Sequence, residues 1–252
     1  SRFEIADVKT TAQANGDEFV LNGEKVVVSN GASANQLIVS ARTSGEQSDE
    51  NGLSLFIVPA DAQGLKVSSY RMMDGQVVAN VTLENVTVSS ANLVGEKDNA
   101  FAVMESVILQ ANVALAAEAV GIMQQLNNKT VEYTKTREQF GVAIGSFQAL
   151  QHRMAEMYLK VEETRSLLLN AAIALDEASD ASAAACAALK VKVSEAGKFV
   201  AQQAVQLHGG IGMTDELCVG HHYKRLMVLA KLYGDEAYYL QKYADLAASR
   251  AA

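Results

Sequence analysis

The sequence is poor in residues that interrupt or cross-link a chain. Its 252 residues include one proline, two cysteines, four histidines and no tryptophan. Cys186 and Cys218 lie far apart and do not have the spacing of metal ligands, so we expect reduced thiols in a cytoplasmic protein. His152 has no cysteine or carboxylate at ligand spacing, and His221 and His222 would point to different sides of a helix. We therefore predict no metal site.

Positive charge and long apolar runs are also scarce. The formal net charge is −8, and no run of lysine or arginine occurs. This balance makes nucleic acid or an anionic membrane surface a poor partner. No uninterrupted apolar stretch approaches the roughly 18 residues of a spanning helix, so we predict no membrane insertion. The opening "SRFEIADVKT" lacks signal-peptide character, and its early strand-like residues indicate that an upstream part is missing.

Residues 1 to 93 alternate between apolar and polar positions, as strands do. The segment "DEFVLNGEKVVVSN" predicts two strands joined by a turn at Asn22–Gly23, because Asn-Gly between apolar runs is a strong hairpin signal. Further strands are expected near 35–43, 52–60, 65–72 and 77–88. Many short strands at this spacing indicate a barrel or a sandwich.

From about residue 100 the pattern changes to that of helices. No proline occurs there, alanine is abundant, and apolar residues from Leu150 to Leu175 recur at steps of three, four or seven. Four helices are expected, near 98–136, 147–178, 180–208 and 219–250. Short loops between such long helices indicate an up-down four-helix bundle. The predicted fold class is α+β, with a β domain over 1–95 and a helical domain over 96–252.

The segment "QLHGGIGMT" (206–214) ends the third predicted helix with three glycines. A helix C-cap needs only one glycine with positive φ. Additional glycines allow a ligand to approach the backbone and expose N–H groups to an anion. Spacing alone leaves both readings of Gly209, Gly210 and Gly212 open. The pattern is not a GxGxxG after a strand, which excludes a Rossmann interpretation.

The segment "TREQFG" (136–141) places Arg137 near Phe140 at the end of the first predicted helix. Arg137 could be a surface arginine with an apolar cap. Alternatively, its guanidinium could bind a phosphate while the aromatic ring packs beside a ligand. In "FQALQH" (147–152), Gln148 could be solvated or could contribute to the same site.

Read together, these segments resemble the acyl-CoA dehydrogenase family. The resemblance rests on "TREQFGVAIGSFQALQHRMAEM", on "AVQLHGGIGMTDE" and on "FVLNGEKVVVSNGASANQLIVSART". "VGHHYKRL" and "YGDEAYYL" resemble most the small subunit of pimeloyl-CoA dehydrogenase-like enzymes. The family has an N-terminal helical domain, a middle β-barrel and a C-terminal four-helix bundle. The resemblance implies that the N-terminal domain and the first barrel strand are absent from this chain.

The resemblance also implies a flavoprotein oxidoreductase that uses FAD to desaturate an acyl-CoA in fatty acid metabolism. In the family, a carboxylate base removes the α proton, and the β hydrogen leaves as hydride to the flavin. Family members usually pass the electrons to an electron-transfer flavoprotein. Arg137 matches an arginine that contacts the flavin's pyrophosphate from a neighbouring subunit. Gln206, Gly209 and Gly210 match the segment that holds the same pyrophosphate. The remaining matches are Phe140 and Gln148, on the adenosine side, and Ser29, beside the flavin ring.

Both positions at which the family carries its base lack a carboxylate here. One aligned position is Tyr233, before Gly234, and the other is Ala111, followed by Asn112. A tyrosine whose pKa is near 10 in solution is a poor base at neutral pH. Three acidic residues could substitute, and each is expected to be a solvated surface carboxylate: Asp235, Glu236 and Glu105.

The favoured hypothesis is an acyl-CoA dehydrogenase subunit in a homo- or hetero-oligomer, a dimer of dimers, with a base-bearing partner. The alternative is a non-catalytic dimerisation subunit that kept the fold and lost the flavin. A related flavin reaction such as monooxygenation is a third possibility that no residue singles out. Arg42, Lys224 and Arg225 are conceivable partners for the phosphates of coenzyme A.

Overall fold

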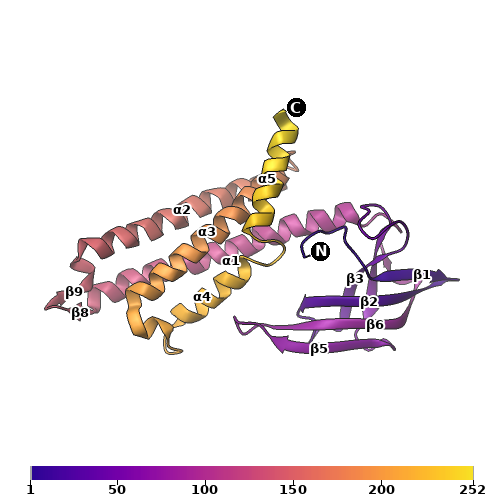
Figure 1. The fold of residues 1–252 in the computed structure, drawn as a ribbon, viewed down its shortest axis with the longest axis horizontal. Helices are drawn as coiled ribbons and strands as arrows, with labels where there is room; N and C mark the ends of the chain where they lie inside the picture. Colours follow the sequence, from indigo (N-terminus) through magenta and orange to yellow (C-terminus); the bar gives the residue numbers. More distant parts are fainter. Residues whose placement is uncertain (1, 252) are drawn as a thin grey trace. The chain divides into compact units, whose positions relative to one another are not determined.

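The computed structural model describes residues 2–251, which form two compact units (Figure 1). The units divide between Val107 and Ile108, inside the first long helix. The first unit contains the strands that the sequence predicts, and the second contains the helices. The predicted α+β class is thus confirmed.

The first unit is one seven-stranded mixed sheet with the order β5-β6-β2-β1-β3-β4-β7. All strand pairs are antiparallel except β1 and β3, which pair in parallel at Thr11 and Arg42. The strands are β1 (Thr11–Asn15), β2 (Glu18–Ser29), β3 (Gln36–Arg42), β4 (Leu53–Pro59), β5 (Leu65–Arg71), β6 (Val77–Ser89) and β7 (Leu93–Val94).

The sheet curls around its own core, so that strands far apart in the sheet order face each other. β4 contacts β6, although three strands separate them in the sheet order. Alternate side chains of these strands point inward, as the period of a strand requires. The rings of Phe19 on β2 and Phe56 on β4 meet at 4.9 Å between centroids. The core of this unit is therefore shared by strands from both ends of the sheet.

The hairpin predicted at Asn22–Gly23 is wrong, because β2 runs without interruption through these residues. The turn lies at residues 16–17, where β1 leads into β2. At Gly23 the pairing of β2 with β6 shifts, and a Cβ there would lie 2.7 Å from the Cα of Thr10. Gly23 is therefore required by the close approach of another backbone segment. The Asn22 carboxamide accepts a hydrogen bond from the N–H of Asn85.

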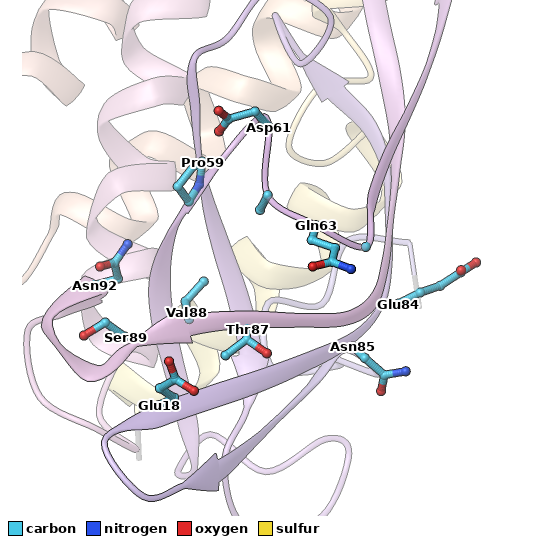
Figure 2. Close-up of a pocket in the computed structure, with 12 residues that line it drawn as sticks. Glu18, Pro59, Asp61, Gln63, Glu84, Asn85, Thr87, Val88, Ser89 and Asn92 are labelled. Carbon is cyan, nitrogen blue, oxygen red and sulfur yellow. The ribbon is translucent and has the colours of Figure 1, made fainter.

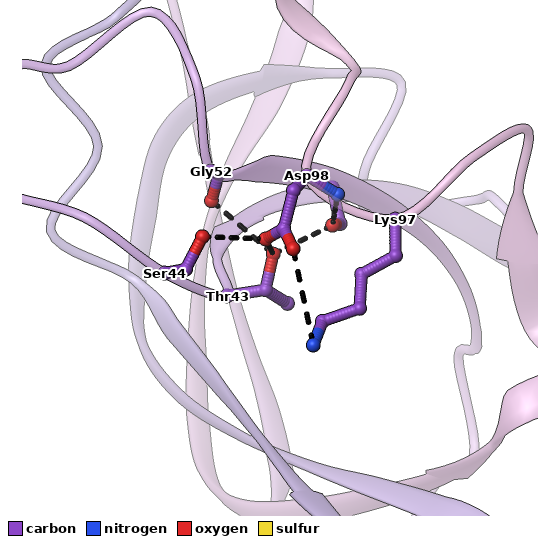
Figure 3. A network of polar contacts seen from close by, with 6 residues as sticks. Thr43, Ser44, Gly52, Lys97 and Asp98 are labelled. Carbon is purple, nitrogen blue, oxygen red and sulfur yellow. Dashed lines mark hydrogen bonds and ion pairs between the residues drawn. The ribbon is translucent and has the colours of Figure 1, made fainter.

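A polar network around Asp98 fixes the segment that leads into the first helix (Figure 3). One carboxylate oxygen accepts hydrogen bonds from Thr43 (2.6 Å) and Ser44 (2.8 Å), and the N–H of Asp98 donates to Ser54. Desolvation raises the pKa of Asp98, but the hydroxyl donors and Lys97 outweigh it, so the pKa lies below its ordinary value. The 43–52 loop, the start of β4 and the segment before the helix are therefore held together.

The second unit is the helical bundle, with α3 at its centre. Its helices are α1 (Phe101–Thr136), α2 (Gln148–Asp176), α3 (Ser182–His208), α4 (Cys218–Leu229) and α5 (Glu236–Ala251). α3 contacts α2, α4 and α5, and its small residues Ala196, Ala201 and Ala204 are fully buried. Small side chains on the central helix allow the surrounding helices to approach it closely.

The helix predicted over 219–250 is two helices, α4 and α5, separated by a turn. Tyr233 has a φ of 55° and Gly234 a φ of 124°, neither of which is compatible with a right-handed helix. The buried ammonium of Lys190 on α3 donates to the carbonyls of Leu229 (2.8 Å) and Leu232 (2.6 Å). These bonds satisfy carbonyl groups that the end of α4 leaves unpaired.

Among the residues described, α1 alone is long and apolar enough to cross a membrane. Core helices of bundles have the same composition. α1 supplies Ala116, Met123 and Leu126 to the bundle core, where each is almost fully buried. Its composition is thus accounted for in part by the packing of the second unit.

Candidate functional site

A cavity of about 460 Å³ in the second unit brings together four of the predicted site residues. They are Arg137, which follows α1, and Gln206, Gly209 and Gly210 at the end of α3. The first turns of α2 form another wall of the cavity. Residues that are about 70 positions apart in the sequence therefore line one cavity.

Glycine occupies the three positions after α3 for three different physical reasons. Gly209 has a φ of 66° and a ψ of −145°, a conformation that essentially only glycine adopts. A Cβ at Gly212 would lie 2.9 Å from the Cβ of His208. At Gly210 the φ is not positive, and a Cβ would have nothing within 4 Å. Nothing within the described chain requires glycine at 210, and its open side is part of the cavity wall.

Arg137 is positioned by backbone bonds on both sides. Its N–H donates to Tyr133 at 2.9 Å, and its carbonyl accepts from Ile144 at 2.8 Å. The guanidinium is exposed and makes no hydrogen bond or ion pair with the residues described. A planar cation without a partner among residues 2–251 is suited to a ligand phosphate.

Phe140 and Gln148 lie near this cavity in sequence but do not line it. Phe140 and Gly141 have φ values of 55° and 81°, those of a two-residue type I′ turn between β8 (Glu138–Gln139) and β9 (Val142–Ala143). Phe140 is 91% exposed, and its ring centroid lies 6.2 Å from that of Phe147, with 79° between the planes. The turn requires positive φ at both positions, which is strained for a bulky residue such as Phe140. Gln148 is exposed at the start of α2.

An aromatic stack forms the inner wall of the cavity. The imidazole of His208 lies 4.5 Å from the Tyr133 ring, with 25° between the planes. His208 is 5% exposed, and its Nδ1 lies 2.8 Å from the carbonyl of Ala204. Burial lowers the pKa of His208, against the raising effect of that hydrogen bond. The imidazole is therefore neutral at neutral pH, with Nδ1–H as the donor to Ala204.

The charge of the cavity is positive. Arg137 and Arg153 both line it, and none of the described residues lining it is aspartate or glutamate. With the open side of Gly210, this arrangement fits a ligand that carries phosphates. Sequence reasoning missed Tyr133, Gln139, Arg153 and His208 as lining residues. His208 stands inside the glycine segment, which was a local signal for it. Arg153 lines the cavity because α2 packs on α3, and such a contact leaves no local signal in the sequence.

A larger cavity in the first unit, of about 810 Å³, has the opposite character (Figure 2). It is lined by the carboxylates of Glu18, Asp61 and Glu84 and by uncharged residues. Glu84 is paired with Lys66 at 2.7 Å, but Lys66 does not line the cavity. Carboxylates repel phosphates, so this cavity is a poor place for a dinucleotide or for coenzyme A.

Ser29 is the last residue of β2, in the first unit, and is exposed. The pairing of β2 with β6 shifts between Lys25 and Val28, which marks a bulge. Val27 has a φ of 53°, an outlier for a β-branched residue, and its N–H donates to Asn80. Bulges change the direction of the side chains that follow them, so the bulge at Val27 sets the orientation of Ser29. Its contact with a flavin stays a prediction.

A chain of hydrogen bonds links the two regions in which the family carries its base, from Asn112, the neighbour of Ala111, to Tyr233. The buried carboxamide of Asn112, next to Ala111, donates to the hydroxyl of Tyr239 at 2.6 Å. That hydroxyl donates to the carbonyl of Tyr233 at 2.8 Å. Neither Ala111 nor Tyr233 supplies a carboxylate, but both lie within one locality of the bundle.

Of the acidic candidates, Asp235 is not a free surface carboxylate. One of its oxygens accepts the N–H of Tyr238 in the first turn of α5, and the other pairs with Lys231 at 3.2 Å. This is the geometry of an N-terminal helix cap. Glu236 is exposed in the first turn of the same helix, and Glu105 is half-buried on α1.

Two of the cations considered for coenzyme A have structural partners. Arg42 is 7% exposed, and its guanidinium donates to four backbone carbonyls of the first unit: Ala6, Gln47, Asp49 and Asn51. Arg225 forms a two-pronged pair with Glu118 at 2.6 and 2.9 Å. Residues 2–251 hold no cluster of three or more potential metal ligands among histidine, cysteine, aspartate and glutamate.

Comparison with known proteins agrees with this architecture. Residues 1–86 match the middle domain of acyl-CoA dehydrogenases, and residues 100–245 match their C-terminal domain. A probable acyl-CoA dehydrogenase of Bacillus subtilis is 37% identical over 232 residues, which cover 91% of this chain and 60% of that protein. The chain thus spans about three fifths of the length of this relative.

Solved structures show the same similarity. One, described as an electron transferring flavoprotein of Acidaminococcus fermentans, has a TM-score of 0.90 and 30% identity, covering 96% of this chain and 64% of its own. Another, described as the FAD complex of PigA, has a TM-score of 0.93 and 26% identity, covering 99% and 66%. With a curled sheet, a helical bundle and a phosphate-suited cavity at the matching segments, the chain belongs to the acyl-CoA dehydrogenase family.

Proposed function

We propose that this chain is a subunit of an FAD-dependent acyl-CoA dehydrogenase, which desaturates an acyl-CoA thioester between its α and β carbons. The observation that carries the proposal is the cavity shared by Arg137, Gln206, Gly209 and Gly210. It combines an unpaired guanidinium, an amide side chain and a glycine whose Cβ position is open. FAD bound in the PigA structure, which has the same fold, supports the choice of this dinucleotide.

FAD, when bound, accepts a hydride from the β carbon of the acyl chain. Within this chain, Arg137 would bind the diphosphate of the cofactor, and the open side of Gly210 would admit its oxygens close to the backbone. Gln206, exposed at the end of α3, would donate a hydrogen bond from its carboxamide. The Tyr133–His208 stack would shield one side of the cavity from water.

The α proton needs a base that neither aligned position supplies. Asp235 is engaged in capping α5, and position 233 carries a tyrosine in place of a carboxylate. We therefore propose a dimer of dimers in which a paralogous subunit carries the base. An electron-transfer flavoprotein is the proposed electron acceptor, in line with the description of one similar structure.

The test is to purify the full-length protein alone and together with its paralogous subunit. Both samples are examined for flavin absorbance and for acyl-CoA oxidation with an artificial electron acceptor. A yellow protein that turns over only with the partner is the expected result. A yellow protein that is fully active alone would remove the need for a partner base.

The missing carboxylates favour a second candidate, a non-catalytic subunit that kept the bundle as a dimerisation device. This candidate requires a protein that stays colourless when excess FAD is added. The unpaired state of Arg137 and the open side of Gly210 argue against it, because a bundle that only dimerises needs neither.

A further inference from the structure

Arg153 is a cation of the cavity that the family resemblance does not assign. It lies in the second turn of α2 and lines the same cavity as Arg137. Its Nη1 donates to Oε1 of Gln203 on α3 at 2.9 Å, one helical turn before Gln206. Arg153 is thus tied to the helix whose end carries the glycine segment.

The partner of Arg153 is an uncharged amide, so it does not compensate the charge of the guanidinium. The Gln203 oxygen restrains the guanidinium without neutralising it, whereas a carboxylate would do both. Elsewhere in the bundle, cations commonly pair with carboxylates, as Arg225 does with Glu118 and Lys160 with Glu195. The full charge of Arg153 therefore stays available in a cavity that already holds Arg137.

Arg165 shows the alternative arrangement on the same helix. Its Nη2 donates to the amide of Gln124 at 2.7 Å, but its Nε also lies 3.3 Å from Glu162. Arg165 is not among the residues lining the cavity. Each of these two arginines of α2 donates to an amide, but among the residues described only Arg153, the one in the cavity, makes no ion pair.

We propose that Arg153 is a second phosphate-binding residue of this cavity, which Gln203 holds in place. A diphosphate bridge carries a negative charge on each of its phosphates, and two separate guanidinium groups can divide that charge. The His208 ring, which stacks on Tyr133 and whose pKa burial lowers, adds no positive charge. This inference rests on the proposed function, because it assumes that the dinucleotide binds here.

The experiment measures the dissociation constants of FAD and of ADP for the full-length apoprotein by titration calorimetry. ADP carries the adenosine and the diphosphate without the flavin ring. Arg153→Gln is expected to weaken both ligands about 10- to 100-fold, since a charge-assisted hydrogen bond is lost. Arg153→Lys keeps the charge without the planar fork and should weaken them less.

Two further variants separate positioning from folding. Gln203→Glu leaves the arginine in place but pairs it with a carboxylate, so both ligands should again bind more weakly. The matched control is Arg165→Gln, which removes an arginine from the same helix outside the cavity and should leave both dissociation constants unchanged.

Equal affinities for wild type and Arg153→Gln would overturn the inference and leave the proposed function standing. So would a loss for FAD without a loss for ADP, or the same loss in Arg165→Gln. A wild-type protein that takes up no FAD overturns the proposed function itself. These outcomes are therefore distinguishable.

Discussion

The hydroxyl of Tyr239 on α5 donates a hydrogen bond to the backbone carbonyl of Tyr233 at 2.8 Å. Tyr239 is 2% exposed, whereas Tyr233 is 46% exposed at the turn between α4 and α5. The ring of Tyr239 also occupies the space beside Gly234 where a Cβ would lie. A buried side chain thus holds the turn in which Tyr233 and Gly234 adopt positive φ.

We predict that Tyr239→Phe destabilises the bundle. The variant leaves the carbonyl of Tyr233 and the buried carboxamide of Asn112 without the hydroxyl as a partner. Losing a partner of a buried polar group costs about 1 to 3 kcal/mol. Urea denaturation measures the change, with Tyr243→Phe on the same helix, at a ring 43% exposed, as the control. Equal stability of the two variants would show that the bond contributes nothing.

The adjacent glycines of the cavity are predicted to respond differently to alanine. Gly209→Ala forces a side chain into a conformation that only glycine tolerates, which costs about 1 to 3 kcal/mol of stability. Gly210→Ala should change stability by less than roughly 0.5 kcal/mol, because its Cβ has open space.

The same Gly210→Ala variant should weaken FAD binding by about tenfold, equivalent to about 1.4 kcal/mol, because the methyl group occupies space next to the ligand. Thermal unfolding and FAD titration on both variants give the two readouts. If Gly210→Ala binds FAD as tightly as wild type, the glycine is not there for a ligand.

The helices and strands were largely predictable because their signals are local. Alternation marks the strands, and the spacing from Leu150 to Leu175 marks α2. The division at Tyr233–Gly234 was missed because a non-glycine residue with positive φ leaves no pattern. It depends on Lys190, more than 40 positions earlier in the chain, and on Tyr239. Similarly, Asn22–Gly23 has the composition of a turn, but Thr10 on a neighbouring segment determines the use of that glycine.

The site residues divide in the same way, into those that stand in local motifs and those that depend on packing. Arg137, Gln206 and the glycines stand in short motifs, so the sequence indicates them. Arg153 joins the cavity only because α2 packs on α3, where Gln203 meets it. From the sequence, Arg42 was a conceivable partner for the phosphates of coenzyme A. Its burial depends on how the 43–52 loop folds back to supply three carbonyls and on Ala6, which supplies the fourth; no motif encodes this arrangement.

Arg42→Lys is predicted to destabilise the first unit even though the charge is retained. The guanidinium serves four carbonyls with two nitrogens, and an ammonium cannot reproduce that planar fork. Leaving some of these part-buried carbonyls without their donor should cost about 1 to 3 kcal/mol. Hydrogen exchange should show residues 43–52 exchanging faster than in wild type. Lys66→Ala, which removes an exposed ion pair, serves as the control and should change little.

The pH dependence of stability should carry a contribution from Lys190. Burial lowers the pKa of this lysine from 10.5 to about 8 in the folded protein. Between these values the unfolded chain binds more protons than the folded one, so the free energy of unfolding rises with pH. The gain should approach about 3 kcal/mol between pH 8 and 10.5, because a tenfold change in a proton-binding constant corresponds to about 1.4 kcal/mol. Lys25, whose pKa burial also lowers to about 8, contributes in the same direction in the first unit.

Lys190→Met isolates the bundle contribution: the difference in unfolding free energy between wild type and this variant should increase with pH across this window. A difference that stays constant across it would mean that Lys190 has the same pKa in both states.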